Sequence, residues 1–304
     1  MGKPLQGVLA MLVTPFDPHY ELNEAALRQE IDWCVAHGAN GVVATPSIGE
    51  FLHLTESERL RCYQITVEQA RQHGDLITVA MTSGATTLEA LKYSRIAGEM
   101  GYDAALLIPP YYWRCGETEV YRHYEMVAGA GDLPVVVYHN PALSKFHMKP
   151  EFIGRLADID GIVAIKEVLT DLQHLEALFD HAAGKIRILQ TFRAYFIARL
   201  MGAAGGFINV FAVPACVAID RALADGDTAR ALEIQRRLNR VFPRGGEESL
   251  GHLGHTKVTA SVVTGIDMGP ARPPYLAPPD AEQRLRQRLP QLKELVPWEE
   301  VCRT

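Results

Sequence analysis

The sequence has few cysteines, no excess of basic residues and no long apolar run, and each shortage excludes a class of protein. The cysteines are scattered and form no CxxC pair, so we expect reduced thiols in a cytoplasmic protein. They are Cys34, Cys62, Cys115, Cys216 and Cys302. Acidic residues outnumber basic ones, 36 to 30, for a net charge of −6, and no Lys/Arg cluster occurs. We therefore expect neither nucleic acid nor an anionic membrane as a partner.

Membrane and export signals are missing as well. No apolar stretch reaches the length of a membrane span. The first apolar run begins too early and ends at Pro15, which does not fit a signal peptide. We expect a globular chain of 304 residues, 48% of them hydrophobic, which is enough for one large core or two smaller domains.

Short apolar runs alternate with amphipathic segments along most of the chain. The expected strands are residues 7–13, 41–45, 76–81, 104–108, 134–139, 162–166, 186–190 and 206–210. Helical spacing is found between them at residues 23–37, 56–73, 88–100, 117–129 and 172–182. Eight strands alternating with helices predict an α/β protein with a (β/α)8 TIM barrel. The alternative is a doubly wound open sheet, which is disfavoured because no G-x-G-x-x-G follows the first strand.

The strand pattern stops near residue 212. Residues 216–242 and 280–295 have helical patterns, and a Gly/Pro-rich stretch separates them. We predict a C-terminal helical extension packed on the barrel. The expected division is residues 1–211 for the barrel with the active site and residues 212–304 for the helical region.

One lysine, Lys166, ends the buried run "IVAIK". In a (β/α)8 barrel, chemistry gathers at the carboxyl ends of the strands. Lys166 alone could simply extend its ammonium out of the barrel end. However, Tyr138 ends the neighbouring strand. Burial lowers the pKa of a lysine, its neutral amine can then form a Schiff base with a ketone, and a tyrosine can move the proton involved.

Several motifs together resemble the pyruvate-dependent class I aldolases, the dihydrodipicolinate synthase and N-acetylneuraminate lyase superfamily. They are "GVLAMLVTPF", "PSIGE", "PPYY", "YHNPALS", "IKE" and "GAAGGFINV", in that order. The resemblance implies a (β/α)8 barrel with C-terminal helices, a homotetramer, no metal or organic cofactor, and a 2-oxo acid substrate with a pyruvate moiety.

The resemblance also assigns roles to residues. It implies that Lys166 forms the Schiff base and that Tyr138 transfers the proton. Ser47 stands at the first Thr/Ser of the family's "GTTGE" motif, where its hydroxyl and nearby backbone N–H groups would hold the pyruvoyl carboxylate. Tyr112 matches a catalytic tyrosine that, in the synthases, reaches into the site of a neighbouring subunit.

Departures from the family pattern narrow the substrate. Leu143 stands where the synthases place an arginine, so dihydrodipicolinate synthesis is disfavoured. Phe192 and Arg193 replace the acidic residues with which sialic acid lyases hold sugar hydroxyls. Ile48 replaces the second Thr of "GTTGE", which breaks a hydroxyl relay and adds apolar surface. We place these four side chains in the substrate-binding set, together with Ile208 of the eighth strand.

A second resemblance is to the hydratase-aldolases, which cleave substituted benzylidenepyruvates into an aromatic aldehyde and pyruvate. It is carried by Asn140, Trp113, Lys257, "FPRG" (242–245) and "GPARPPY" (269–275). Tyr112 departs from that group. The prediction is therefore a Schiff-base lyase that forms or consumes pyruvate, with an aromatic aldehyde as the other product.

The alternatives are another pyruvate-class lyase or a deaminase, acting on a hydroxy-oxo-acid or a hydroxypyrroline carboxylate, and a non-catalytic barrel that binds a 2-oxo acid. Single residues stay open too. Asn140 could orient the water that adds to the alkene, or it could be an ordinary turn residue before proline. Trp113 could contact the substrate ring, but a core or interface position is more common for an aromatic.

Five further residues are expected to be structural. His252 and His255 are interpreted as loop histidines without a function, because no third ligand lies nearby in the sequence. His139 should face away from Tyr138 by strand alternation and serve packing. In "PSIGE", Gly49 would permit a tight loop and Glu50 would hold it through backbone hydrogen bonds.

Overall fold

A computed structural model describes residues 3–243 and 252–297 of the chain. The second half of "FPRG", Arg244 and Gly245, and Cys302 lie outside the described residues. The chain divides into two compact units, one of Met1–Gly7 and Ile77–Phe207 and the other of Val8–Leu76 and Ile208–Thr304.

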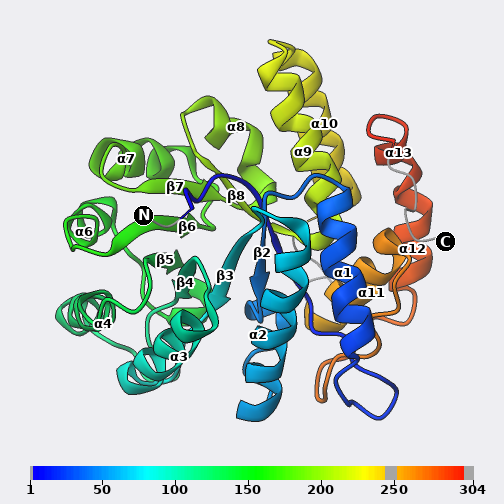
Figure 1. The fold of residues 1–304 in the computed structure, drawn as a ribbon. Helices are drawn as coiled ribbons and strands as arrows, with labels where there is room; N and C mark the ends of the chain where they lie inside the picture. Colours follow the sequence, from blue (N-terminus) through cyan, green and yellow to red (C-terminus); the bar gives the residue numbers. More distant parts are fainter. Residues whose placement is uncertain (1–2, 244–251, 298–304) are drawn as a thin grey trace. The chain divides into compact units, whose positions relative to one another are not determined.

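The described residues form a closed barrel of eight parallel strands in chain order, which confirms the predicted (β/α)8 fold and excludes the open sheet (Figure 1). The strands are β1 (Gly7–Met11), β2 (Gly41–Ala44), β3 (Ile77–Met81), β4 (Ala104–Leu107), β5 (Val135–His139), β6 (Ile162–Glu167), β7 (Arg187–Gln190) and β8 (Gly205–Asn209).

Helices follow each strand. Those that alternate with strands are α1 (Glu24–Ala36), α2 (Glu56–Ala70), α3 (Thr87–Met100), α4 (Glu117–Gly129), α5 (Pro141–Ser144), α6 (Pro150–Leu156), α7 (Leu172–Ala182) and α8 (Tyr195–Leu200). After β8 come α9 (Val213–Ala224), α10 (Thr228–Val241), α11 (His252–Thr264), α12 (Ala281–Arg288) and α13 (Pro290–Lys293). None of the described helices is long and apolar enough to cross a membrane.

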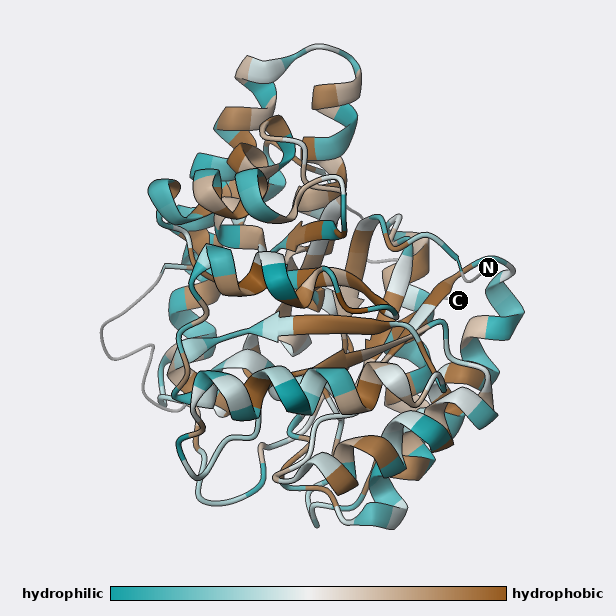
Figure 2. Cartoon of the chain, turned by 90° about the vertical axis from the view of Figure 1, so that its left-hand side faces the viewer, coloured by the Kyte–Doolittle hydropathy of each residue, from teal (hydrophilic) through white to brown (hydrophobic). Residues whose placement is uncertain are grey.

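Most strand residues are apolar because a parallel barrel strand is covered on both faces. Every residue of β4 and β5 is buried, and the strands are brown over most of their length in Figure 2. The backbones of Gly205 in β8 and Gly7 in β1 approach each other closely. A Cβ on Gly205 would lie 2.0 Å from the carbonyl oxygen of Gly7, so only glycine fits there.

Helix bounds follow the sequence signals closely. The predicted helices at residues 117–129 and 172–182 coincide with α4 and α7. A capping box starts α2, where the Thr55 hydroxyl accepts from the backbone N–H of Glu58 and the Glu58 carboxylate accepts from that of Thr55. α6 was not predicted; it packs beside α7 (Figure 1).

The described residues after β8 are largely helical, as predicted, with two differences. The predicted helical segment at residues 216–242 is two helices, α9 and α10, because Gly226 adopts a φ of +77° and turns the chain between them. The Gly/Pro-rich stretch also contains a helix, α11, which had not been predicted. The division at residue 212 stays a prediction about domain organisation.

Candidate active site

Lys166 and Tyr138 are paired at the ends of β6 and β5. The two residues are register partners in the parallel ladder, and both are buried. The Lys166 Nζ lies 3.8 Å from the centroid of the Tyr138 ring and 5.8 Å from that of Phe207. Burial lowers the pKa of Lys166, while interaction with Tyr138 acts in the opposite direction. The pair thus provides an amine that loses its proton more readily than an ordinary lysine.

Asn140 contacts this pair directly. Its side-chain Nδ2 donates a hydrogen bond of 3.0 Å to the Tyr138 hydroxyl oxygen. Asn140 is also the residue that precedes Pro141 at the start of α5, so it is a turn residue as well. A hydrogen bond donated to the phenolic oxygen stabilises the deprotonated form of the hydroxyl, and that is the form that can take up a proton. This suits a group that takes up and returns a proton.

His139, Glu167 and His174 form a buried cluster in which the potential ligand atoms lie within 4.8 Å of one another. The spacing would suit a metal ion, but the hydrogen bonds do not. Met148 N–H donates to His139 Nε2, at 3.0 Å, so that nitrogen carries the lone pair. His139 Nδ1 must then carry the proton, which it donates to Glu167. The cluster is therefore a hydrogen-bonded network, and His139 does more than the packing predicted for it.

The "PSIGE" segment forms a tight turn after β2, with a 3₁₀ turn at Ser47–Gly49. A Cβ on Gly49 would lie 2.9 Å from both the Leu12 carbonyl oxygen and Pro46 Cδ, so glycine is required by the close approach. The N–H groups of Gly49 and Glu50 donate to Pro46 and Ser47 within the turn. Ser47 is half-buried and Ile48 is buried. The carboxylate-holding role of Ser47 stays a prediction.

Glu50 anchors this turn, as predicted. Its Oε2 accepts from the backbone N–H of Arg272 and lies 3.0 Å from His53 Nδ1. Its Oε1 lies 3.2 Å from the Nζ of Lys257, and both side chains are buried. Burial lowers the pKa of Lys257 to about 8, against the opposing effect of Glu50. Glu30 lies in the same unit, fully buried, and burial raises its pKa well above the ordinary value.

Thr45, which precedes the turn, is strained. It has a φ of +45°, a conformation that is uncommon for a β-branched residue. Its buried hydroxyl has no hydrogen-bond partner among the described residues. Strain of this kind concentrates at functional sites, which fits a ligand-binding role for the turn. The sequence showed no sign of it.

Tyr112 and Trp113 are exposed on the loop after β4, at 73% and 80% of their surface. Their rings meet edge to face with centroids 5.4 Å apart. The Lys145 ammonium donates to the Tyr112 carbonyl oxygen and lies 5.5 Å from the Tyr112 ring centroid. Trp113 is therefore not part of the core of this chain, contrary to one of the predicted options.

The remaining substrate-binding candidates differ in exposure. Phe192 is buried, and the Arg193 guanidinium lies 4.7 Å from the centroid of its ring. Leu143 on α5 is 47% exposed, whereas Ile208 on β8 is fully buried.

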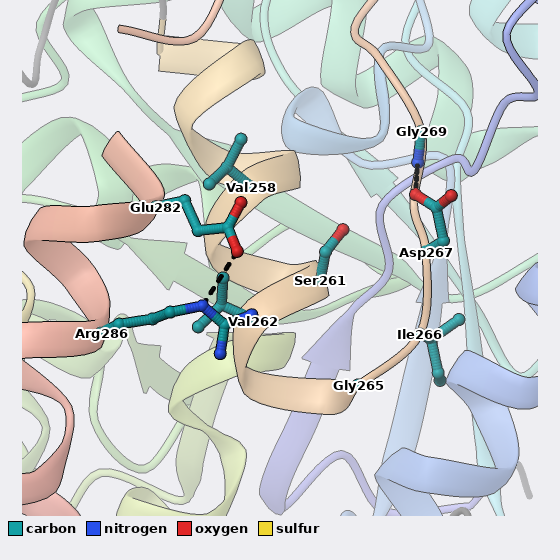
Figure 3. A pocket seen from close by; sticks show the side chains of 9 residues that line it. All are labelled: Val258, Ser261, Val262, Gly265, Ile266, Asp267, Gly269, Glu282 and Arg286. Carbon is teal, nitrogen blue, oxygen red and sulfur yellow. Dashed lines mark hydrogen bonds and ion pairs between the residues drawn. The ribbon is translucent and has the colours of Figure 1, made fainter. Parts of the chain in front are cut away.

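His252 and His255 lie on α11 and not in a loop, which corrects that prediction. The same helix contributes to a cavity of about 410 Å³ bounded by α11, α12 and the segment between them (Figure 3). The cavity is lined by Val258, Ser261, Val262, Gly265, Ile266, Asp267, Gly269, Glu282 and Arg286. Its one pair of facing charges, Glu282 and Arg286, is already joined in an ion pair. None of the predicted site residues lines it.

Sequence reasoning missed the partners of the predicted residues. Glu167 was seen only as part of the "IKE" motif, and His174 was not singled out. Strand alternation could have indicated that His139 and Glu167 face the same side of neighbouring strands. Nothing in the sequence indicates that α7 brings His174 to the same carboxylate.

The chain is a closed (β/α)8 barrel with a buried lysine beside a tyrosine at the carboxyl ends of adjacent strands, the edge at which barrel enzymes place their active sites. Residues 4–291 match the Dihydrodipicolinate synthetase family, and the chain belongs to this family of lyase- and synthase-type enzymes. This confirms the first resemblance predicted from the motifs.

Individual relatives carry several names. The chain is 32% identical to a 4-hydroxy-tetrahydrodipicolinate synthase of Methanothrix thermoacetophila, over 95% of this chain and 98% of that protein. It is 30% identical to an N-acetylneuraminate lyase of Salmonella paratyphi B, over 80% and 82%. Among solved structures, it resembles the E. coli prophage protein YagE in complex with pyruvate, with a TM-score of 0.86 and 24% identity over 95% and 99% of the two chains.

Proposed function

We propose that this protein is a Schiff-base lyase that cleaves a 2-oxo acid to pyruvate and an aldehyde, or joins the two. The observation that carries the proposal is the burial of Lys166 directly against Tyr138. A lysine needed only for binding would gain nothing from a dry environment, whereas a nucleophilic amine gains the neutral form it needs. A relative of similar fold, YagE, has been solved with pyruvate, which supports the choice of substrate moiety.

The proposed reaction uses the side chains in turn. The neutral Lys166 amine adds to the ketone carbon of the 2-oxo acid, and loss of water leaves an iminium. The carbon–carbon bond then breaks, its electron pair moves into the iminium to give an enamine, and the substrate hydroxyl loses its proton to Tyr138 as the aldehyde forms. Protonation of the enamine and addition of water release pyruvate and restore the amine.

For the substrate, we propose an arylidenepyruvate, in which water adds to the conjugated alkene before the cleavage. The support is the apolar character of the substituted positions: Ile48, Leu143 and Phe192 stand where relatives of this family would use polar groups. A sugar hydroxyl buried against such residues would lack a hydrogen-bond partner, and each such hydroxyl would cost about 1–3 kcal/mol of binding free energy. An aryl ring would instead gain from burial and ring contacts. Several relatives are named 4-hydroxy-tetrahydrodipicolinate synthase, which makes the synthase reaction of that name the second candidate.

Trapping with borohydride tests the mechanism. With pyruvate and borohydride, the intact mass should rise by one reduced pyruvoyl group, located on Lys166 by peptide mapping. Lys166→Ala should abolish the adduct without unfolding the chain, because it removes a buried amine. An adduct on Lys145 or Lys257 instead, or none, would refute the mechanism and favour a non-catalytic 2-oxo-acid-binding barrel.

A substrate panel tests the aromatic proposal separately. We expect the highest kcat/KM for benzylidenepyruvate among benzylidenepyruvate, N-acetylneuraminate, 2-keto-3-deoxygluconate and 4-hydroxy-2-oxoglutarate, with hydroxypyrroline carboxylate and the synthase reaction included as further arms. A wide margin for an aliphatic or sugar acid would refute the aromatic substrate and leave the Schiff-base mechanism standing.

We further propose a homotetramer located in the cytoplasm. The exposed ring pair Tyr112 and Trp113 supports assembly, because large aromatic side chains are seldom left in solvent. The scattered, unpaired cysteines of the described residues agree with a reducing compartment.

A further inference from the structure

The ladder between β5 and β6 places two residue pairs side by side. Tyr138 is the register partner of Lys166, and His139 is the partner of Glu167. Because successive strand residues point to opposite faces, His139 and Glu167 face away from the lysine–tyrosine pair while sharing its backbone. Contacts that hold His139 and Glu167 in place therefore also restrain the backbone that carries Tyr138 and Lys166.

Glu167 is tied on both of its oxygens. Its Oε2 accepts from His139 Nδ1 at 2.8 Å and from His174 Nε2 at 2.9 Å. Its Oε1 accepts from the backbone N–H groups of Val168 and Leu169, at 2.7 and 2.8 Å. The carboxylate thus receives four hydrogen bonds in a fully buried position, and its acceptor capacity is used.

These contacts keep the carboxyl group ionised. Burial acts to raise the pKa of Glu167, but the hydrogen bonds from His139 and His174 outweigh it and hold the pKa at about 2. Hydrogen bonds to a buried carboxylate are short and strong because the surroundings screen the charge poorly.

The donors come from separate elements. His139 belongs to β5 and is itself held by the Met148 N–H, which precedes α6. His174 lies in the first turn of α7, and the accepting carboxylate ends β6. The network therefore joins the ends of two strands and the start of a helix at one buried charge.

We propose that Glu167, held by His139 and His174, is the positioning group that sets the Lys166 amine against Tyr138. The inference rests on the proposed function. Neither histidine nor Glu167 needs to touch the substrate; they act through the backbone of β5 and β6. Catalysis depends steeply on such placement, since a shift of about 1 Å in a reacting group can cost about 100-fold in rate.

His174 offers the sharpest test because one substitution keeps its donor and another removes it. His174→Gln places an amide N–H where Nε2 stands and should still donate to Glu167. His174→Leu has a similar volume but no donor. A matched control is His123→Leu, which removes a different buried histidine, bonded to Thr87 on another helix pair.

The measurements are kcat and KM for pyruvate release, the rate of borohydride-trapped adduct on Lys166, and the melting temperature. We expect His174→Leu to lower kcat and the trapping rate about 10-fold or more with KM little changed. His174→Gln should stay within about threefold of the unaltered protein. His123→Leu should lower the melting temperature without changing kcat. His139→Leu, measured in the same way, should lose about 10- to 100-fold.

Two results separate the possible failures. If the unaltered protein traps pyruvate and His174→Leu and His139→Leu retain its kcat, losing only thermal stability, the network is structural and the positioning role is refuted. If the unaltered protein forms no adduct at all, the proposed function fails, and this inference fails with it.

Discussion

The ammonium of Lys166 is buried in protein, and this burial controls the pH at which its neutral amine becomes available. Burial lowers its pKa below 10.5, so a neutral amine is available at lower pH than for a lysine in water. We expect the rate of pyruvate trapping to rise with pH and to reach half of its maximum below 10.5. Acetylation of the exposed Lys145, followed in the same samples, provides the comparison.

The Tyr138 hydroxyl acts on the same pKa with the opposite sign, since its interaction raises the pKa of Lys166. Tyr138→Phe should therefore move the midpoint of trapping to lower pH. A midpoint that stays at the position of an ordinary lysine in both proteins would contradict the burial of the amine.

Proton transfer by Tyr138 can be tested apart from trapping. Tyr138→Phe keeps the ring and removes the hydroxyl, and we expect turnover to fall by about two to four orders of magnitude. Asn140→Ala removes only the donor to that hydroxyl and should cost about 10-fold, the scale of one hydrogen bond. Steady-state kcat values for both variants measure this. Near-normal turnover in Tyr138→Phe would show that another group, such as a water held by Asn140, carries the proton.

At the scale of elements, an ion pair links helix α11 to the turn at Ser47–Gly49. The Lys257 ammonium, with its pKa lowered from 10.5 to about 8, lies against Glu50 in a buried position. Between pH 8 and 10.5 the unfolded chain binds more protons than the folded one, so this lysine makes the free energy of unfolding rise with pH in that window.

Lys257→Met should remove this rise and leave Glu50 buried without its cation, which costs about 3–5 kcal/mol when one partner of a buried pair is deleted. Denaturant unfolding at pH 8 and pH 10 measures both effects. Lys149→Met, at an exposed lysine, is the matched control and should change neither. A pH profile of Lys257→Met that overlays that of the unaltered protein would exclude this contribution.

Element type and bounds were predictable where periodicity and caps agreed. The α4 and α7 bounds were predicted correctly because apolar spacing runs through both segments; Glu117 and Glu119 stand in the first turn of α4, and Asp171 caps α7. α11 was missed because the Gly/Pro-rich stretches on both sides of it conceal a short helix. The α9–α10 break was missed because Asp225–Asp227 looks like a polar helix surface until Gly226 takes a positive φ.

At the scale of the whole molecule, the exposed pair Tyr112 and Trp113 leads to a prediction about assembly. Apolar ring surface of this size is stabilised when a second chain covers it. We expect a tetramer by analytical ultracentrifugation, and Trp113→Asp should shift the protein to a smaller species, because a charge would be buried in the interface. Leu276→Asp, at a comparably exposed apolar residue, is the control. An unchanged mass for Trp113→Asp would place the interface elsewhere.

The sequence by itself determined the barrel and the pairing of Lys166 with Tyr138. Runs of buried apolar residues alternating with amphipathic helices allow few other folds, and a parallel strand that ends in lysine beside one that ends in tyrosine brings the two together by adjacency alone. Both conclusions follow from local patterns and from the order of strands.

Only the tertiary structure decided how that pair is held. Glu167 is hydrogen-bonded to His139, 28 positions away in the sequence, and to His174 at the start of α7. Glu50 forms an ion pair with Lys257, which lies on the distant helix α11. No periodicity encodes such contacts, because each depends on the distance and direction between side chains that the folded backbone alone brings within hydrogen-bonding reach.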